Sequence, residues 1–190
     1  MIKKILIGLL AIVIVFVIIV ALQPPEYRVV RSASISAPPA TVFAQVNDFH
    51  NWQAWSTWAK LDPGMKQSYE GPPAGTGAIY SWVGNAKVGE GRMTLTESRP
   101  NELIRIKLDF IKPLEGHNVA EFALAPQGDS TSVTWTMDGP SPYVGKLIGV
   151  FVNMDTMIGK EFETGLANLK GIAEKQSHEQ SLLVRGRESS

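Results

Sequence analysis

Three different spacings of apolar residues divide the chain. Residues 5–22 form an unbroken apolar run, residues 66–138 alternate between apolar and polar side chains, and residues 144–175 carry apolar side chains at spacings of three and four. These patterns are typical of a membrane-spanning helix, of half-buried strands and of an amphipathic helix, respectively. The chain is therefore predicted to be an N-terminal anchor followed by an α+β domain that ends in a long helix.

The N-terminal run "ILIGLLAIVIVFVIIVAL" contains no charged or strongly polar side chain, and it follows Lys3 and Lys4. In a helix, these eighteen residues would span about 27 Å, close to the hydrocarbon thickness of a bilayer. A cleaved signal peptide is the competing interpretation, but the exit sequence "IVALQPPE" is a poor match to a cleavage site. We expect residues 5–22 to be a single-pass helix in the cell membrane, with the N-terminus cytoplasmic and the domain extracytoplasmic.

The residues that follow the anchor predict one strand and two short helices. "EYRVVRSASIS" alternates as a strand, and a pair of prolines separates it from a short helix over residues 40–49. A second short helical stretch carries Trp52, Trp55 and Trp58 and stops near "DPG". Because a spacing of three spreads these rings over a wide arc, we expect Trp55 and one neighbour to be core and one ring to reach a cavity.

Six more strand candidates follow, and turn residues separate most of them. In one of them Ile104, Ile106, Leu108 and Phe110 share a side, and charged residues take the other. One dry face and one wet face are typical of an antiparallel sheet that packs on one side only. We expect a curved antiparallel sheet of about seven strands around the long C-terminal helix, with a concavity between them.

These patterns assign residues 1–25 to the anchor and a short proline linker, residues 26–175 to the domain, and residues 176–190 to a disordered tail. Acidic and basic residues balance at 18 each with no basic stripe, so no nucleic-acid partner is expected. The chain contains no cysteine and three dispersed histidines, which leaves no expected metal site and no expected cofactor.

Acid–base chemistry has two weak candidates. Asp155 lies on or beside the apolar stripe of the last helix, where an apolar pocket would raise the pKa of its carboxyl group. His50 precedes the tryptophans and is the other possible base. Their alternative interpretations are a solvent-facing aspartate and a packing or capping histidine.

The order of elements, together with "ISAPPATVFAQVNDFHNWQAWSTW", "GTGAIYSWVGN", "GEGRMTLTES" and "SVTWTMDG", resembles the START-like, or SRPBCC, superfamily. Within it, the resemblance is to the bacterial branch labelled polyketide cyclase/dehydrase and lipid transport, and it covers residues 27–174. Thr57 replaces a proline that is frequent in the family. The resemblance implies a helix-grip fold with an internal apolar cavity, but it leaves function open because the superfamily contains both carriers and enzymes.

Aromatic and methionine side chains suit an adaptable apolar site, although they also fill ordinary cores. The residues expected to line a ligand cavity are Trp55, Trp58, Tyr80, Trp82, Phe110, Trp135, Met137, Phe151, Met154 and Ile158.

Three functional hypotheses follow. The first is a membrane-anchored domain that binds a hydrophobic small molecule or lipid. The second is a cyclase- or dehydratase-like enzyme that uses Asp155 or His50. The third is an adaptor that binds a protein through the outer face of the sheet or through Arg185 and Arg187 of the tail.

Overall fold

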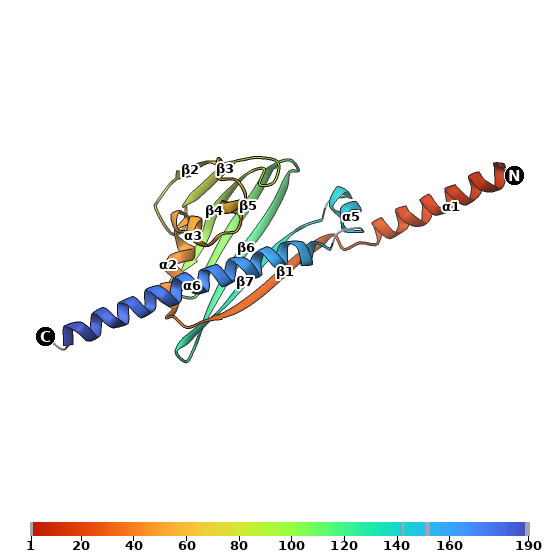
Figure 1. The fold of residues 1–190 in the computed structure, drawn as a ribbon. Coiled ribbons are helices and arrows are strands. Elements are labelled where there is room, and N and C mark those ends of the chain that lie inside the picture. The colour runs from red at the N-terminus through yellow and green to blue at the C-terminus, as the bar shows by residue number, and fades with distance from the viewer. Residues whose placement is uncertain (1, 142, 151–152, 189–190) are drawn as a thin grey trace.

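The structure, a computed structural model, describes residues 2–141, 143–150 and 153–188 (Figure 1). Its elements are α1 (Ile2–Ala21), β1 (Glu26–Ile35), α2 (Pro39–Asn47), the 3-10 helix η1 (Phe49–Asn51), α3 (Trp52–Trp55), α4 (Trp58–Leu61), β2 (Lys66–Glu70), β3 (Ile79–Val83), β4 (Glu90–Arg99), β5 (Leu103–Lys112), β6 (Gly116–Gln127), β7 (Ser130–Pro140), α5 (Tyr143–Gly149) and α6 (Met154–Glu188).

Within these described residues, seven strands form one antiparallel sheet in the order β1-β7-β6-β5-β4-β3-β2. The sheet curves around α6, and α2 and α3 pack beside that helix (Figure 1). This arrangement confirms the predicted α+β helix-grip fold. Because every neighbouring pair is antiparallel, β1, β4 and β6 begin at the same end of the sheet, and β3, β5 and β7 finish there.

The concave face of the sheet carries the apolar rows. In the register between β1 and β7, Val29 lies opposite Met137 and Arg31 lies opposite Trp135, while Trp135 lies opposite Phe122 of β6. All five side chains point toward α6, since residues two apart in a strand share a face.

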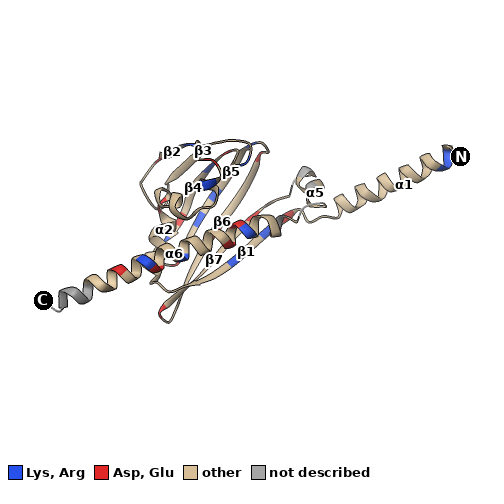
Figure 2. Cartoon of the chain, viewed as in Figure 1, with Lys and Arg blue, Asp and Glu red and all other residues tan. Residues whose placement is uncertain are grey.

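The convex face carries ion pairs between neighbouring strands, and Figure 2 marks where acidic and basic residues occur along the strands. Arg105 contacts Glu97 at 2.6 Å and Glu121 at 2.7 Å, and Lys112 contacts Glu90 at 2.8 Å. This is the alternation expected of a sheet with one solvated face.

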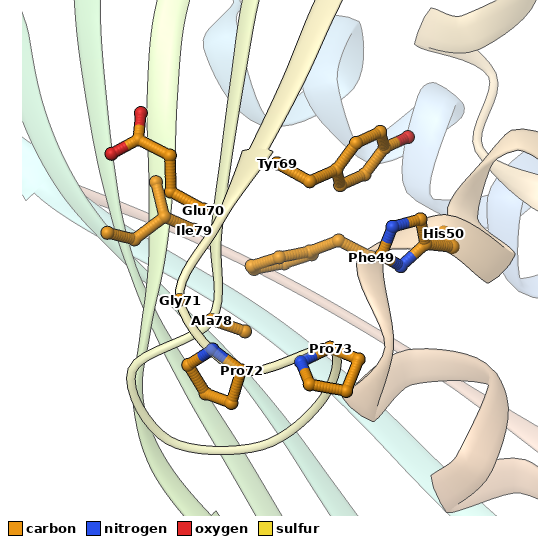
Figure 3. A pocket seen from close by; sticks show the side chains of 9 residues that line it. All are labelled: Phe49, His50, Tyr69, Glu70, Gly71, Pro72, Pro73, Ala78 and Ile79. Carbon is orange, nitrogen blue, oxygen red and sulfur yellow. The ribbon is translucent and has the colours of Figure 1, made fainter.

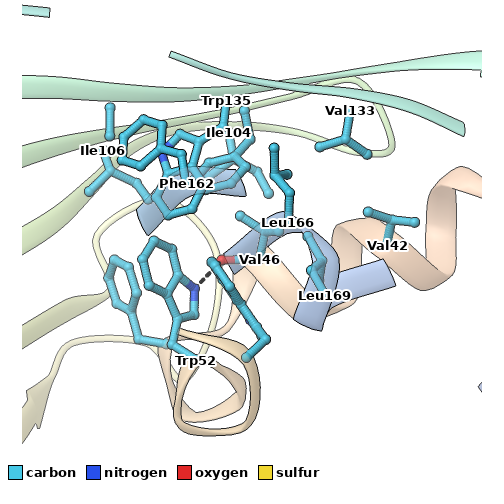
Figure 4. Close-up of a cluster of buried hydrophobic side chains, with 14 of the residues drawn as sticks. Val42, Val46, Trp52, Ile104, Ile106, Val133, Trp135, Phe162, Leu166 and Leu169 are labelled. Carbon is cyan, nitrogen blue, oxygen red and sulfur yellow. Dashed lines mark hydrogen bonds between the residues drawn. The ribbon is translucent and has the colours of Figure 1, made fainter. Parts of the chain in front are cut away.

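α6 presents a continuous apolar stripe to the sheet and to the short helices. Phe162, Leu166, Leu169 and Ala173, which are spaced by four, three and four residues, are all buried (Figure 4). Val42 and Val46 of α2 complete this part of the core. The predicted stripe is confirmed over this part of the helix.

Two details of the last helix differ from the prediction. A single helix is expected from residue 144 to residue 175, but the structure has the separate helices α5 and α6, with glycines at positions 145 and 149 in the first of them. Asn153 begins α6 by accepting a hydrogen bond from the Thr156 backbone N–H at 3.1 Å, the usual role of an N-cap side chain.

The other difference concerns the expected disordered tail, residues 176–190, because α6 continues to Glu188. Good helix formers such as Glu and Gln extend the helix, and Lys175 and Glu179 form an i,i+4 ion pair at 3.9 Å. The apolar period is lost in this segment, but the helix propensity is not.

Among the described residues, α1 is the helix that is long and apolar enough to cross a membrane. It projects from one end of the domain, and α6 points away from it toward the other end (Figure 1). Almost all of its side chains are exposed except Val20, near its C-terminal end where α1 meets α5. Its length and composition fit either an anchor or a signal sequence.

We expect Phe122→Ala to destabilise the domain by about 3–5 kcal/mol, because it empties a fully buried position on the concave face. Val30→Ala, on the exposed convex face, is the matched control and should change stability by less than about 0.5 kcal/mol. Urea unfolding of the full chain in detergent micelles, followed by circular dichroism, measures both. Equal effects of the two substitutions would contradict the assignment of the core.

Candidate functional site

The concave face has one sealed half and one half that is less completely covered. The sealed half contains side chains that are wholly buried, among them Ile35, Leu95, Ile104 and Phe122. The other half, where β1 begins and β7 ends, contains large apolar side chains that keep some contact with solvent. They are Trp82, Met93, Leu108 and Met137, which are 5–9% exposed, and the half-buried Phe110 and Ile158. We call this second set, together with Tyr27 and Tyr80, the open half.

Five of the predicted ligand-binding residues lie in the open half: Tyr80, Trp82, Phe110 and Met137 on the sheet and Ile158 on α6. Tyr80 stacks on Trp82 at a centroid distance of 5.8 Å, and Phe110 meets the edge of Trp82 at 6.1 Å. Burial raises the pKa of Tyr80 to about 12, so its hydroxyl is neutral at physiological pH.

Gly91 makes room for the indole of Trp82 on the neighbouring strand. A Cβ atom at position 91 would lie 2.4 Å from the Trp82 ring. The ring therefore lies flat across β4, and its Nε1–H donates to the Val88 carbonyl at 3.0 Å. Gly91, the second residue of β4, thus shapes this wall of the open half.

The predicted residues Trp55, Trp58 and Trp135 lie together in an aromatic cluster at the middle of the fold. Trp135 stacks on Phe162 of α6 at a centroid distance of 3.8 Å and an interplanar angle of 7°. Trp55 is fully buried, and the half-buried Trp58 meets the edges of both Trp135 and Phe162. In Figure 4, Trp135 and Phe162 fill the space between sheet and helix. This packing supports the core interpretation for Trp55 and Trp135.

For two further residues that were predicted to line the cavity, the structure does not describe the side chain. Phe151 lies outside the described residues. Met154 is the first residue of α6, and only its backbone is described.

The aromatic cluster contains one unpaired polar group. The Trp135 Nε1–H is buried and has no hydrogen-bond partner among the described residues. Trp52 and Trp55 differ, because their indoles donate to the Val46 and Gln45 carbonyls at 2.9 Å and 3.2 Å. Since buried donors are nearly always paired in folded proteins, the Trp135 indole is available to an incoming acceptor.

A hollow of about 400 Å³ opens beside the open half, and we call it the mouth hollow. It lies between the linker, the start of β1, α5 and the start of α6, and its lining includes Pro24, Tyr27, Lys146 and Asn153. No local sequence pattern indicates this hollow, because its walls come from four separate segments.

Tyr27 forms the boundary between the mouth hollow and the concave face. Its hydroxyl donates to Asn118 Oδ1 at 3.1 Å, and its ring passes Gly139, where a Cβ atom would lie 3.2 Å from it. Burial, followed by the nearby Asp138 carboxylate, raises the pKa of Tyr27. The alternation of β1 could have placed Tyr27 on the inner face, since it shares a side with Val29.

Asp155 is not in an apolar pocket, which corrects the expected environment. Arg31, on the inner face of β1, donates from Nη1 to Asp155 Oδ1 at 2.9 Å and from Nη2 to Oδ2 at 3.0 Å. Arg31 also donates from Nε to Glu163 at 2.7 Å. The Arg31 hydrogen bonds hold the pKa of the exposed Asp155 carboxyl below its usual range, the opposite of the expected shift.

This group of Arg31, Asp155 and Glu163, which we call the clamp, ties the start of α6 to β1. Gly159 lets the guanidinium lie against the helix, since a Cβ atom there would overlap Arg31. Asp155 is therefore a structural partner of Arg31, and it lies in the wall of the mouth hollow.

His50 is exposed, and it is separated from the open half by the ring of Tyr69, whose centroid lies 5.3 Å from that of Tyr80. Its Nδ1 is 2.7 Å from Asp48 Oδ1, and its ring stacks on Tyr69 at 4.0 Å. His50 and Tyr69 border a second hollow of about 230 Å³. Pro72 and Pro73 of the β2–β3 loop help to line it (Figure 3). Asp48 is the N-cap of η1 and accepts from the His50 backbone N–H at 2.9 Å, while the His50 ring packs on Tyr69.

Among the described residues, no three His, Asp or Glu side chains are grouped to hold a metal ion. The ionisable groups of the open half are the neutral tyrosines 27 and 80. The chemistry available there is apolar contact with a few hydrogen bonds.

A family model described as polyketide cyclase / dehydrase and lipid transport matches residues 26–174. Similar solved structures include a protein from Chromobacterium violaceum (18% identity, TM-score 0.56, covering 80% of this chain and 99% of that one) and a protein from Nitrosospira multiformis (21% identity, TM-score 0.57, 80% and 99%). The Aha1 dimer from Colwellia psychrerythraea is also similar (14% identity, TM-score 0.56, 78% and 96%). At these identities the structures show a shared fold. Among curated proteins no match is found.

The lowered pKa of Asp155 predicts a pH-dependent contribution of the clamp. The contribution is present above the unfolded-state pKa of about 3.9 and is lost as the pH falls through the lower folded-state value. Asp155→Asn should therefore melt at a lower temperature than the unchanged chain at pH 7, and the two melting temperatures should converge near pH 2. Thermal unfolding monitored by circular dichroism across this range measures the difference. A gap that stays constant with pH would contradict the clamp.

Proposed function

Because the chain belongs to the polyketide cyclase / dehydrase and lipid transport family, we propose that it is a membrane-anchored domain that binds an apolar small molecule or lipid in its open half. The observation that carries this proposal is the uneven sealing of the concave face. The distal half contains most of the wholly buried side chains, such as Ile35, Ile104 and Phe122, whereas the other half contains the half-buried Phe110 and Ile158 and lies beside the mouth hollow.

The side chains of the open half favour an adaptable, apolar ligand. Met93 and Met137 are flexible and polarisable, and Trp82 and Phe110 offer broad apolar faces. Transfer of apolar ligand surface from water to such a site contributes roughly 25 cal/mol per Å². A ligand that covers these faces gains affinity without any charged partner.

The unpaired Trp135 Nε1–H suggests one polar feature of the ligand. A buried donor that lacks a partner costs about 1–3 kcal/mol, and a ligand oxygen that reached it would remove this cost. We infer a ligand that is mostly hydrocarbon and carries a hydroxyl, carbonyl or carboxylate oxygen.

The acid–base alternative has weaker support. Asp155 is paired with Arg31, and His50 lies at the surface beside Tyr69 and Asp48. Asp155 lines the mouth hollow, but Arg31 holds its carboxylate, and His50 contacts the open half only through the ring of Tyr69.

The adaptor alternative also has weaker support. The convex face carries ion pairs such as Arg105–Glu121 in place of a continuous apolar patch. The side chains of Arg185 and Arg187 lie outside the described part of the structure, so the tail adds no argument for it.

A matched pair of substitutions tests the proposed site. Phe110→Ala should weaken binding of cis-parinaric acid by about tenfold, because the loss of a ring contact removes roughly 1.5 kcal/mol. Val119→Ala, on the exposed convex face of β6, should leave the affinity unchanged. Fluorescence titration of the full chain in detergent micelles, with empty micelles as the blank, measures both. Failure of the unchanged chain to bind the probe, or equal affinities of both variants, would refute the proposed site.

A further inference from the structure

Five exposed apolar side chains lie at the end of the domain from which α1 leaves. They come from three separate segments: Leu22 after α1 (78% exposed), Ile111 and Leu114 at the end of β5 and in the turn to β6 (48% and 55%), and Tyr143 and Leu147 on α5 (60% and 36%). In Figure 1, α5 and the β5–β6 turn are at the end of the domain that faces α1. We call these five residues the rim.

The linker holds this end of the domain close to the end of α1. Residues 23–25 separate Leu22 from β1, so the connection can reach at most about 10 Å. The linker is also tied down, because the Ser141 backbone N–H donates to the Pro25 carbonyl at 2.7 Å. Pro24 and Pro25 further restrict its conformations.

α5 is fixed beside the same end of α1. Val20 has no exposed surface, although nearly every other side chain of α1 is exposed, and α1 packs against α5 there. A bilayer that contains α1 would therefore have α5 at its surface. Tyr143 and Leu147 would reach the headgroup layer, and Lys146 between them could place its ammonium group among lipid phosphates.

We propose that the rim rests on the outer leaflet of the bilayer that holds α1, so that the open half of the grip faces the membrane. This inference rests on the proposed function, because it requires α1 to remain as an anchor. The rim contacts the lipid surface itself. Only residues 23–25 separate Leu22, at the end of the membrane helix, from the first strand of the domain.

The consequence for function is a short path between the bilayer and the binding site. The mouth hollow is lined by Pro24 of the linker, Lys146 of α5 and Tyr27 at the edge of the concave face. Because Glu26, Arg28 and Asp155 also line this hollow, a molecule with an apolar body and a polar end that left the outer leaflet could reach Tyr27 through it by a short path. The substrate class is therefore an apolar, membrane-dissolved molecule rather than a water-soluble one.

The absence of cysteine from the chain allows a direct test, because each introduced cysteine carries a unique label. The full chain is placed in nanodiscs of phosphatidylcholine and phosphatidylglycerol, with nitrobenzoxadiazole on Leu22→Cys, Leu114→Cys or Leu147→Cys. Asp129→Cys, in the β6–β7 turn at the opposite end of the sheet, is the control. Lipids that carry a doxyl quencher near the headgroup quench a label that contacts the headgroup layer. The mass of the unlabelled chain, which is 20.8 kDa when the anchor is not cleaved, shows that the anchor is present.

We expect the labels at positions 22, 114 and 147 to lose most of their fluorescence to the doxyl lipid and the label at 129 to retain it. Quenching at 22 with none at 114 or 147 would overturn the rim while leaving the anchor intact. A shortened chain, or no quenching at 22, would overturn both the anchor and the rim. Equal quenching at 129 would show that the domain has no fixed orientation and would also overturn the inference. Ile111→Cys and Tyr143→Cys offer second positions on the two rim segments.

Discussion

The stacking of Trp135 on Phe162 is the contact on which the rest of the domain depends. It joins β7, next to the edge strand β1, to the first third of α6 with nearly parallel rings whose centroids are 3.8 Å apart. Aromatic side chains bury about 150–250 Å² each, so this contact and its neighbours Phe122 and Trp55 dominate the apolar burial at the centre. The cluster also divides the concave face: α2 and α3 seal one side of it, and the open half lies on the other.

The structure is polarised along its length as a result. At the distal end, the short helices and the stripe of α6 bury Val42, Val46 and Leu169 completely. Toward α1, the clamp holds α6 against β1 by hydrogen bonds and ion pairs with Arg31 in place of apolar packing. Because polar contacts hold the start of α6 at β1, the helix does not cover the apolar residues of the open half completely. A binding site requires such incompletely covered apolar surface. The apolar surface that remains exposed at this end is the surface nearest the proposed membrane.

The sequence predicted the architecture well because its signals are local. Alternation in β5 and the spacing of Phe162, Leu166 and Leu169 each report one element and the face it buries, and both are confirmed. The break between α5 and α6 and the helical continuation to Glu188 were missed, because capping by Asn153 and helix propensity outweigh the apolar period that was used to set the limits.

The site was less predictable because it depends on contacts between distant segments. Asp155 is 124 positions from Arg31, and nothing near Asp155 in the sequence indicates that its partner would be a strand residue on the concave face. The division of the aromatic residues into core and open half likewise depends on where α6 crosses the sheet. Alternation could have identified Arg31 and Tyr27 as inward-facing polar residues of β1, but it could not identify their partners.

The central claim is that apolar space is available in the open half and not in the sealed half. Crystals of the full chain pressurised with xenon test it most directly, because xenon binds apolar cavities that water leaves empty. The account predicts xenon in the open half, in contact with Trp82, Leu108 or Met137. Xenon confined to the neighbourhood of Val42 and Leu169, or its absence from the concave face, would contradict it.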